Sequence, residues 1–217
     1  MAIEFEDTWR RRRARAGEPE KHLRRVDPRL GAGIERVMKR LGAQRFAPSV
    51  ACSHFDCIAR SIVYQQLSLK SASTIYGRLL LCLHGRVTAQ RLLDAPVSRL
   101  RGAGLSSAKV RYLRSLATEV VEGRLSLNSV ARASDDEVVS ALTRIRGVGV
   151  WTAQMFLMFR LCRPDVLPAG DAGIRKALQI AHDLSRLPTP AEVAAAGQPW
   201  APYRSIASLY LWALLEL

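Results

Sequence analysis

Two glycines separated by one residue, Gly147 and Gly149, lie between two segments of helical periodicity. Glycine adopts backbone angles that other residues avoid and allows a close approach, so the pair predicts a tight turn. A helix that begins after Gly149 presents its first backbone N–H groups outward, and such a terminus binds anions, including DNA phosphates. The same spacing also suits an ordinary turn between two helices.

The second candidate group is the carboxylate of Asp171, which follows Pro168 and Gly170 where a new helix is expected to begin. An aspartate at this position commonly caps a helix through its side-chain oxygen. An ionised carboxylate also stabilises positive charge that develops in a reaction, and it can orient or deprotonate a water molecule. Both interpretations are open for Asp171 from its position alone.

The chain is strongly basic, with 33 Lys and Arg against 19 Asp and Glu among 217 residues, a formal net charge of +14 and a pI of about 10.6. Nearly all the cations are arginines, whose planar group pairs with phosphate and stacks on rings. This excess favours a polyanionic partner such as DNA, RNA or an anionic membrane. Arginines spread over solvated faces would give the same composition.

Hydrophobic residues make up 48% of the chain, which excludes wholesale disorder. No stretch approaches the roughly 18–20 apolar residues of a membrane span, and Met1 to Gly17 lacks an apolar secretory segment. We therefore expect no membrane partner and an intracellular protein, cytoplasmic and nucleoid-associated if the source is bacterial. The scattered Cys52, Cys57, Cys82 and Cys162 match neither a disulfide framework nor a paired zinc motif.

Helical periodicity begins near Asp27 and continues along the chain. Cap signals precede several segments: Ser106, the capping box Ser134 to Glu137, and Thr189 followed by a proline. No strand periodicity and no hairpin dipeptide is present, so the predicted class is all-α. The main expected helices cover residues 30–41, 54–67, 70–84, 106–121 and 200–215.

Five ordered segments resemble the helix-hairpin-helix DNA glycosylase superfamily, and three of them resemble its alkylpurine, or 3-methyladenine, branch. The hairpin is Leu142-Thr-Arg-Ile-Arg-Gly-Val-Gly-Val-Trp-Thr-Ala153, and the loop with the catalytic aspartate is Leu167-Pro-Ala-Gly-Asp-Ala-Gly-Ile-Arg-Lys176. The branch-specific segments are residues 62–68 (IVYQQLS), residues 104–109 (GLSSAK), and residues 200–205 (WAPYRS) followed by 210–212 (YLW). The resemblance covers about residue 27 to the end of the sequence.

The resemblance implies two intertwined helical subdomains with the helix-hairpin-helix motif at their cleft. The expected glycosylase domain covers residues 28–217, after a basic arm over residues 1–27. Part of this arm is expected to be either flexible or a short docked segment. The first subdomain takes about 28–50 plus 165–217, the second about 51–164, and the motif about 137–160. Because no cysteine follows Cys162, the four-cysteine iron–sulfur cluster of some relatives is not expected.

The activity implied is that of a monofunctional DNA glycosylase that flips alkylated purines out of duplex DNA and hydrolyses the N-glycosidic bond, the first step of base excision repair. Asp171 is the expected catalytic carboxylate. Trp151 occupies the position of the Schiff-base lysine of bifunctional relatives, and an indole cannot do that chemistry. Its ring also suits cationic bases such as 3-methyladenine and 7-methylguanine.

Further site residues follow from the same motif positions. The expected substrate pocket contains Trp151, Tyr203, Met155 and Trp200. The expected DNA contacts are Gly147, Val148, Gly149, Arg146, Gln66, Ser68, Ser106, Ser107 and Lys109. Two departures from the family pattern are Gly170, where many relatives have a second aspartate, and Met155, where a relative has an aromatic ring.

No cofactor is expected beyond a monovalent cation at the hairpin, which the resemblance assigns to the backbone carbonyls of Thr143, Ile145 and Val148. The expected partner is double-stranded DNA that contains damaged bases, and the expected state is a monomer. Two alternatives stay open: a glycosylase for etheno, deaminated or oxidised bases, and a non-catalytic DNA-binding module that retains the hairpin. An RNA-binding protein is disfavoured because no RNA-binding motif is present.

Overall fold

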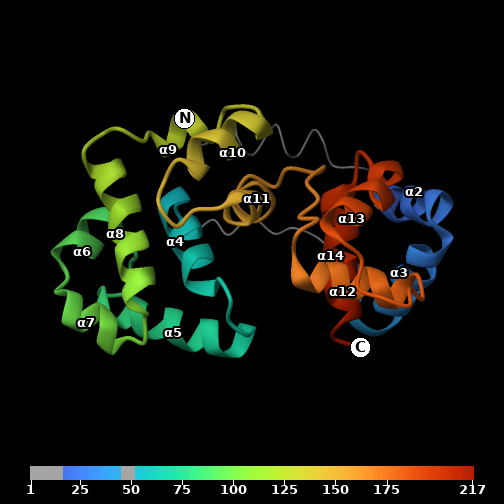
Figure 1. Ribbon diagram of the computed structural model, residues 1–217, viewed down its shortest axis with the longest axis horizontal. Coiled ribbons are helices and arrows are strands. Elements are labelled where there is room, and N and C mark those ends of the chain that lie inside the picture. The colour runs from blue at the N-terminus through green and yellow to red at the C-terminus, as the bar shows by residue number, and fades with distance from the viewer. Residues whose placement is uncertain (1–16, 45–51) are drawn as a thin grey trace. The chain divides into compact units, whose positions relative to one another are not determined.

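The computed structural model describes residues 17–44 and 52–217, and every regular element in these ranges is a helix (Figure 1). The all-α prediction is therefore confirmed for the described part of the chain. The fold divides into two compact units, unit 1 with residues 1–47 and 162–217, and unit 2 with residues 48–161. Among the described helices, none has the length and apolar character needed to cross a membrane.

Unit 1 is built around helix α3, which contacts α2, α12 and α14. Leu30, Ile34 and Val37 of α3 are fully buried, which explains their helical spacing in the sequence. The helices of unit 1 are α2 (Glu18–Val26), α3 (Pro28–Leu41), α12 (Ala172–Ala181), α13 (Pro190–Ala196), the 3-10 helix η1 (Gln198–Trp200) and α14 (Arg204–Leu214).

Helix α2 decides between the two expectations for part of the basic arm, because residues 18–26 are helical and dock against α3. The side chain of Leu23 is fully buried. Acidic residues in the first turn and Arg24 and Arg25 in the last turn complement the helix dipole. One buried leucine among many charges left too weak an apolar pattern for this helix to be predicted. The rest of the arm, residues 1–16, lies outside the described residues.

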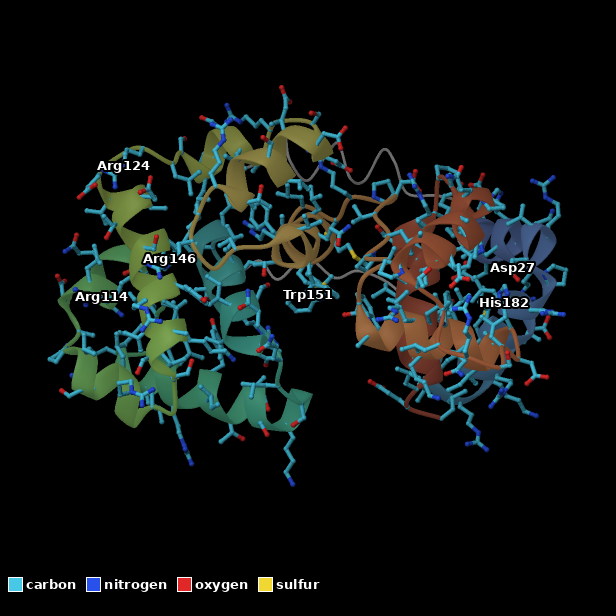
Figure 2. The ribbon with its side chains drawn as sticks, in the orientation of Figure 1. Asp27, Arg114, Arg124, Arg146, Trp151 and His182 are labelled. Carbon is cyan, nitrogen blue, oxygen red and sulfur yellow. The ribbon has the colours of Figure 1, made fainter. Side chains whose placement is uncertain are left out.

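Buried Asp27 organises the polar interior of unit 1. Its carboxylate accepts hydrogen bonds from the Leu30 backbone N–H at 2.9 Å and from Nε1 of Trp200 at 2.9 Å, and it lies 3.0 Å from Nε2 of His182 (Figure 2). Burial acts to raise the pKa of Asp27, but the hydrogen bonds outweigh it, led by the one with His182, so that the pKa lies below its usual value. Asp27 thereby joins the start of α3 to two segments more than 150 residues away.

Unit 2 is built around helix α4, which contacts α5, α8, α9 and α11 (Figure 1). Ile58 and Ile62 of α4 are fully buried. The helices of unit 2 are α4 (His54–Tyr64), α5 (Leu69–Cys82), α6 (Ala89–Asp94), α7 (Val97–Gly102), α8 (Ser107–Val121), α9 (Leu127–Val130), α10 (Asp135–Thr143) and α11 (Val150–Phe159).

The predicted helix starts are confirmed where side chains cap them. The Ser106 hydroxyl accepts from the backbone N–H of Lys109, and Ser134 and Glu137 form a reciprocal capping box. Thr189 forms a second such box with Glu192 at the start of α13. These caps depend on residues three positions apart, so the sequence alone could specify them.

Two predicted helix boundaries are wrong. The helix expected over 54–67 ends at Tyr64, because Gln66 has a positive φ of 55° and breaks the helical path. The helix expected from about Trp200 begins only at Arg204. Pro202 lacks the N–H that a continuous helix would need, and η1 takes the place of the first turn.

Three cations of unit 2 bind the carboxyl ends of its own helices. Lys109 donates to two carbonyls at the end of α4, Arg91 to two at the end of α5, and Arg114 to two at the end of α6. Unpaired carbonyls at a helix end carry partial negative charge, which these cations stabilise. Part of the basic composition is therefore used inside the fold.

Candidate functional site

The hairpin between α10 and α11 contains a four-residue turn. The Val148 N–H donates to the Ile145 carbonyl at 3.0 Å, and Gly147, the third residue, has a φ of 87°. A turn with positive φ at its third residue strongly favours glycine there. The predicted tight turn is present, and its conformation explains Gly147.

Gly147 is also required by packing. A Cβ atom there would lie 2.0 Å from the ring of Tyr112 on α8, so either the ring or the hairpin would have to move. Gly149 differs, because a Cβ atom there would meet nothing within 4 Å. The first glycine is used by the protein itself, and the second leaves an open approach from outside.

Helix α11 begins without a side-chain cap, because Gly149 occupies its N-cap position. Gly149 and Val150 are both exposed, so this helix end is accessible to solvent. Arg146 is exposed on the turn just before it (Figure 2). An accessible helix N-terminus beside an arginine is suited to bind a phosphate group.

A hollow of about 600 Å³ lies beside this turn. Three segments of unit 2 line it: the hairpin over residues 143–149, the α4–α5 junction at Gln65 and Gln66, and the start of α8, represented by Ser106 and Lys109. Gln66, Arg146, Gly147, Val148, Gly149, Ser106 and Lys109 were all predicted DNA contacts, and the fold brings them to one place. Ser68 and Ser107 lie next to the same junctions but do not line the hollow.

The predicted contacts in this hollow differ in their bonding. Lys109 Nζ is bound to the carbonyls of Val63 at 2.6 Å and Gln65 at 2.9 Å, so it stabilises α4 as well as lining the hollow. The hydroxyls of Ser68 and Ser106 cap α5 and α8. These caps leave the serines exposed, so both the capping role and the predicted contact role remain compatible with their positions.

The two predicted pocket residues of unit 2 differ in exposure. Trp151 is half-buried in the first turn of α11 (Figure 2). Met155, one turn further on, is only 5% exposed and packs in the interior of the unit. Trp151 therefore presents ring surface at the start of α11, whereas Met155 offers almost none.

In unit 1, Asp171 is the N-cap of α12. Its Oδ1 accepts from the Ile174 backbone N–H and from Nε1 of Trp212, both at 2.9 Å. A Cβ atom on Gly173 would lie 3.0 Å from this oxygen and 3.1 Å from the indole, so glycine allows the two groups to approach. The capping interpretation is correct, and it fixes the orientation of the carboxylate without excluding catalysis.

The other predicted pocket residues of unit 1 lie elsewhere. Trp200 is fully buried and donates to Asp27, which contradicts the prediction that it lines a substrate pocket. A buried indole N–H requires a hydrogen-bond acceptor, and Asp27 is the acceptor here. Tyr203 is half-buried and lies edge-on to His22 of α2, with ring centroids 5.4 Å apart.

The backbone of the hairpin is compatible with the expected cation. Among the described residues, no backbone N–H donates to the carbonyls of Thr143 and Val148, whereas the Ile145 carbonyl accepts one from Val148. Carbonyl oxygens without amide partners are suitable ligands for a hard cation. Within the described ranges, no cluster of three or more His, Cys, Asp or Glu side chains is arranged for a metal ion.

Comparison with known protein families identifies this architecture. The model of the HhH-GPD superfamily base excision DNA repair proteins matches residues 59–202, which include both the hairpin and Asp171. The chain belongs to this superfamily. The family predicted from the five motifs is thus confirmed.

Individual relatives agree with this assignment. DNA-3-methyladenine glycosylase 1 of Schizosaccharomyces pombe is 32% identical over 87% of this chain and 84% of its own length. A solved structure of the S. pombe 3-methyladenine DNA glycosylase in complex with abasic DNA has a TM-score of 0.81, covering 92% of this chain and 97% of that one. A Bacillus halodurans DNA-3-methyladenine glycosidase structure is 34% identical with a TM-score of 0.72, covering 89% and 87%.

Three residues of the site escaped prediction. Gln65 lies in the family segment 62–68. The sequence did not show that the helix ends at Tyr64, and this end turns the Gln65 side chain toward the hairpin. Tyr112 has no sequence signal, since its contact with Gly147 depends on how α8 packs. Trp212 lies inside one of the family segments, but only the fold reveals its bond to Asp171.

Proposed function

We propose that this protein is a monofunctional DNA glycosylase that removes alkylated purines of the 3-methyladenine and 7-methylguanine type from duplex DNA. It hydrolyses the N-glycosidic bond and leaves an abasic site, which starts base excision repair. The main support is the carboxylate of Asp171, which Trp212 orients at the start of α12 in a chain of this superfamily. The names of its relatives support the substrate class.

Asp171 is the proposed catalytic residue. Cleavage of the glycosidic bond builds positive charge on the sugar, and an ionised carboxylate close to it stabilises that state and orients the attacking water. Hydrogen bonds from the Trp212 indole and the Ile174 amide fix the rotamer of this carboxylate. The residue thus needs little reorganisation during the reaction.

Trp151 is the proposed partner of the damaged base. An alkylated purine that carries positive charge gains about 0.5–2 kcal/mol over an aromatic face. The indole has no amine to attack the sugar, so the proposed reaction is hydrolysis without strand cleavage.

DNA binding is proposed to use the hollow of unit 2. The phosphate backbone meets the N-terminus of α11 and Arg146, while Gln66, Ser68, Ser106 and Ser107 approach the groove from the two neighbouring junctions. These contacts must offset the few kcal/mol needed to unstack and flip a nucleotide. A monovalent cation held by the carbonyls of Thr143, Ile145 and Val148 would supply positive charge next to the phosphate.

The test is a base-release assay on methylated duplex DNA. We expect free 3-methyladenine and 7-methylguanine from the wild type, and release slowed by about 100-fold or more by Asp171→Asn, with DNA affinity retained. Asp183→Asn is the matched control, because Asp183 is exposed in the same unit and should leave release unchanged.

The alternatives give distinct results in the same assay. Release confined to etheno, deaminated or oxidised bases would assign a different lesion class. Tight DNA binding without release from any substrate would identify a non-catalytic module. Release that Asp171→Asn leaves intact would remove Asp171 from the catalytic role.

A further inference from the structure

The side chain of Gln65 connects the end of α4 to the hairpin. Its amide nitrogen Nε2 donates to the Gly147 carbonyl at 2.9 Å and to Oγ1 of Thr152 at 2.8 Å. These two acceptors lie on either side of the start of α11, 82 and 87 residues away along the chain. One amide group therefore uses both of its hydrogens to hold the turn against the first turn of the helix.

The backbone of Gln65 is held from the opposite side. Its carbonyl accepts from Nζ of Lys109 at 2.9 Å, and the same ammonium group binds the Val63 carbonyl at 2.6 Å. Burial lowers the pKa of Lys109, so its environment disfavours the charge that these carbonyls stabilise. The series Lys109, Gln65 and Gly147 links the start of α8, the end of α4 and the hairpin.

The peptide between Gly147 and Val148 is fixed at both of its polar groups. Gln65 binds its carbonyl, and the Ile145 carbonyl accepts from its N–H. Thr152 is 1% exposed, so its hydroxyl would lose its interior donor if the Gln65 amide were removed. Rotation of this peptide would change the direction in which the neighbouring backbone groups face the hollow.

We propose that Gln65, held in place by Lys109, is a positioning residue that sets the hairpin conformation required to grip the DNA backbone. Gln65 acts through the Gly147 peptide and does not itself touch the reacting atoms. This inference rests on the proposed function for its DNA ligand. A purely structural alternative is that Gln65 only adds stability to unit 2.

The test compares substitutions at the two ends of this contact. Gln65→Leu replaces the amide with an apolar side chain and removes both donated bonds. Thr152→Val removes one acceptor, and Thr152→Ser keeps the hydroxyl. Arg91→Met is the matched control, because Arg91 binds two carbonyls at the end of α5 but does not line the hollow. Each protein is titrated with undamaged duplex DNA over a range of salt concentrations, and its unfolding temperature is measured.

We expect Gln65→Leu to weaken DNA binding about 10-fold and to reduce the slope of log affinity against log salt by about one unit, the loss of one phosphate contact. Thr152→Val should weaken DNA binding about 3-fold, because the Gln65 amide loses one of its two acceptors and the hairpin is displaced less. Thr152→Ser should bind DNA like the wild type. Arg91→Met should lower the unfolding temperature and leave DNA affinity unchanged.

A folded Gln65→Leu protein with wild-type affinity and salt slope would overturn the inference. The inference would also be overturned if Arg91→Met, at an equal loss of stability, lost as much DNA affinity as Gln65→Leu. If Gln65→Leu does not fold, Thr152→Val decides, and unchanged affinity in that variant also overturns it. Because the probe is undamaged DNA, this test does not depend on base release. A wild-type protein that releases no alkylpurine would refute the proposed function and leave the inference about Gln65 untouched.

Discussion

Acidic acceptors are prominent in unit 1, and basic donors to helix ends are prominent in unit 2. In unit 1 the acceptors are acids: Asp27 binds Trp200 and His182, Asp171 binds Trp212, and Asp165 pairs with Arg204 through both carboxylate oxygens. In unit 2 the donors are Lys109, Arg91 and Arg114, which bind backbone carbonyls at helix ends. In this chain of net charge +14, the two buried acids among the described residues, Glu20 and Asp27, both belong to unit 1.

The difference has a physical reason and a functional consequence. An acid that accepts several N–H groups is satisfied in the interior, whereas a long basic side chain can lay its stem along apolar surface and place its charged head at a partly solvated helix end. Unit 1 therefore supplies an oriented negative charge, as cleavage chemistry requires. Unit 2 supplies a positive frame with accessible amides, as DNA binding requires.

The largest expected effect comes from removing the buried acid. Asp27→Ala deletes the cap of α3 and leaves the interior N–H of Trp200 without its acceptor, so we expect unit 1 to lose about 3 kcal/mol of stability. Urea unfolding measures this loss. Asp27→Asn keeps a capping oxygen and should cost clearly less. A loss below about 1 kcal/mol for Asp27→Ala would show that the acid does not organise the unit.

The next effect separates two tryptophans of unit 1 that donate to different acids. Trp212→Phe removes the N–H bound to Asp171, and we expect base release at saturating protein to slow about 10-fold, which corresponds to about 1.4 kcal/mol. DNA affinity should not change. Trp200→Phe removes the N–H bound to Asp27 and should lower stability while leaving release unchanged. Equal release rates in both variants would contradict the role of Trp212.

A smaller effect is expected for the cations of unit 2. Arg91→Met and Lys109→Met each free two carbonyls at a helix end that water can partly reach, so each should cost about 1 kcal/mol in urea unfolding. Only Lys109→Met should also weaken DNA binding, because only Lys109 supports Gln65. If either variant lost as much unfolding free energy as Asp27→Ala, the expected difference between the acids of unit 1 and the cations of unit 2 would be wrong.

The smallest effect is a pH dependence in unit 2. Burial and the nearby charge of Arg160 lower the pKa of His54 from 6.5 to about 4. Between these values the unfolded chain binds a proton that the folded chain does not, so the stability contributed by neutral His54 falls as the pH falls from 6.5 to 4. Solvent around this half-buried ring limits the effect to on the order of 0.5–1 kcal/mol. His54→Gln should flatten the stability curve by that amount, and an identical curve would contradict the shift.

Local signals were sufficient for much of this fold. Capping boxes at Ser134 and Thr189 and the glycine turn at Gly147 involve residues close in sequence, so their structure could be predicted. The helix start at Asp171 also depends on neighbouring residues and could be predicted. The family motifs identified the superfamily, which the comparisons confirm.

Long-range polar bonds could not be predicted in the same way. Trp200 was assigned to the pocket from its position in a family motif, yet its N–H binds Asp27, 173 residues earlier. Gln65 and Trp212 each find their partners only when distant helices pack. Hydrophobic periodicity specifies which face of a helix is buried, but it carries no information about which buried polar groups meet.

The order of the units along the chain affects how the protein folds during synthesis. Unit 2 is one uninterrupted stretch from residue 48 to 161, and its contacts are complete once that stretch has left the ribosome. Helices α2 and α3 are made first, but the partners of Asp27 emerge only with residues 182 and 200. Helix α3 must therefore wait through the synthesis of an entire second unit before α12 and α14 can cover it, and this interval is when a nascent chain would be most open to chaperones.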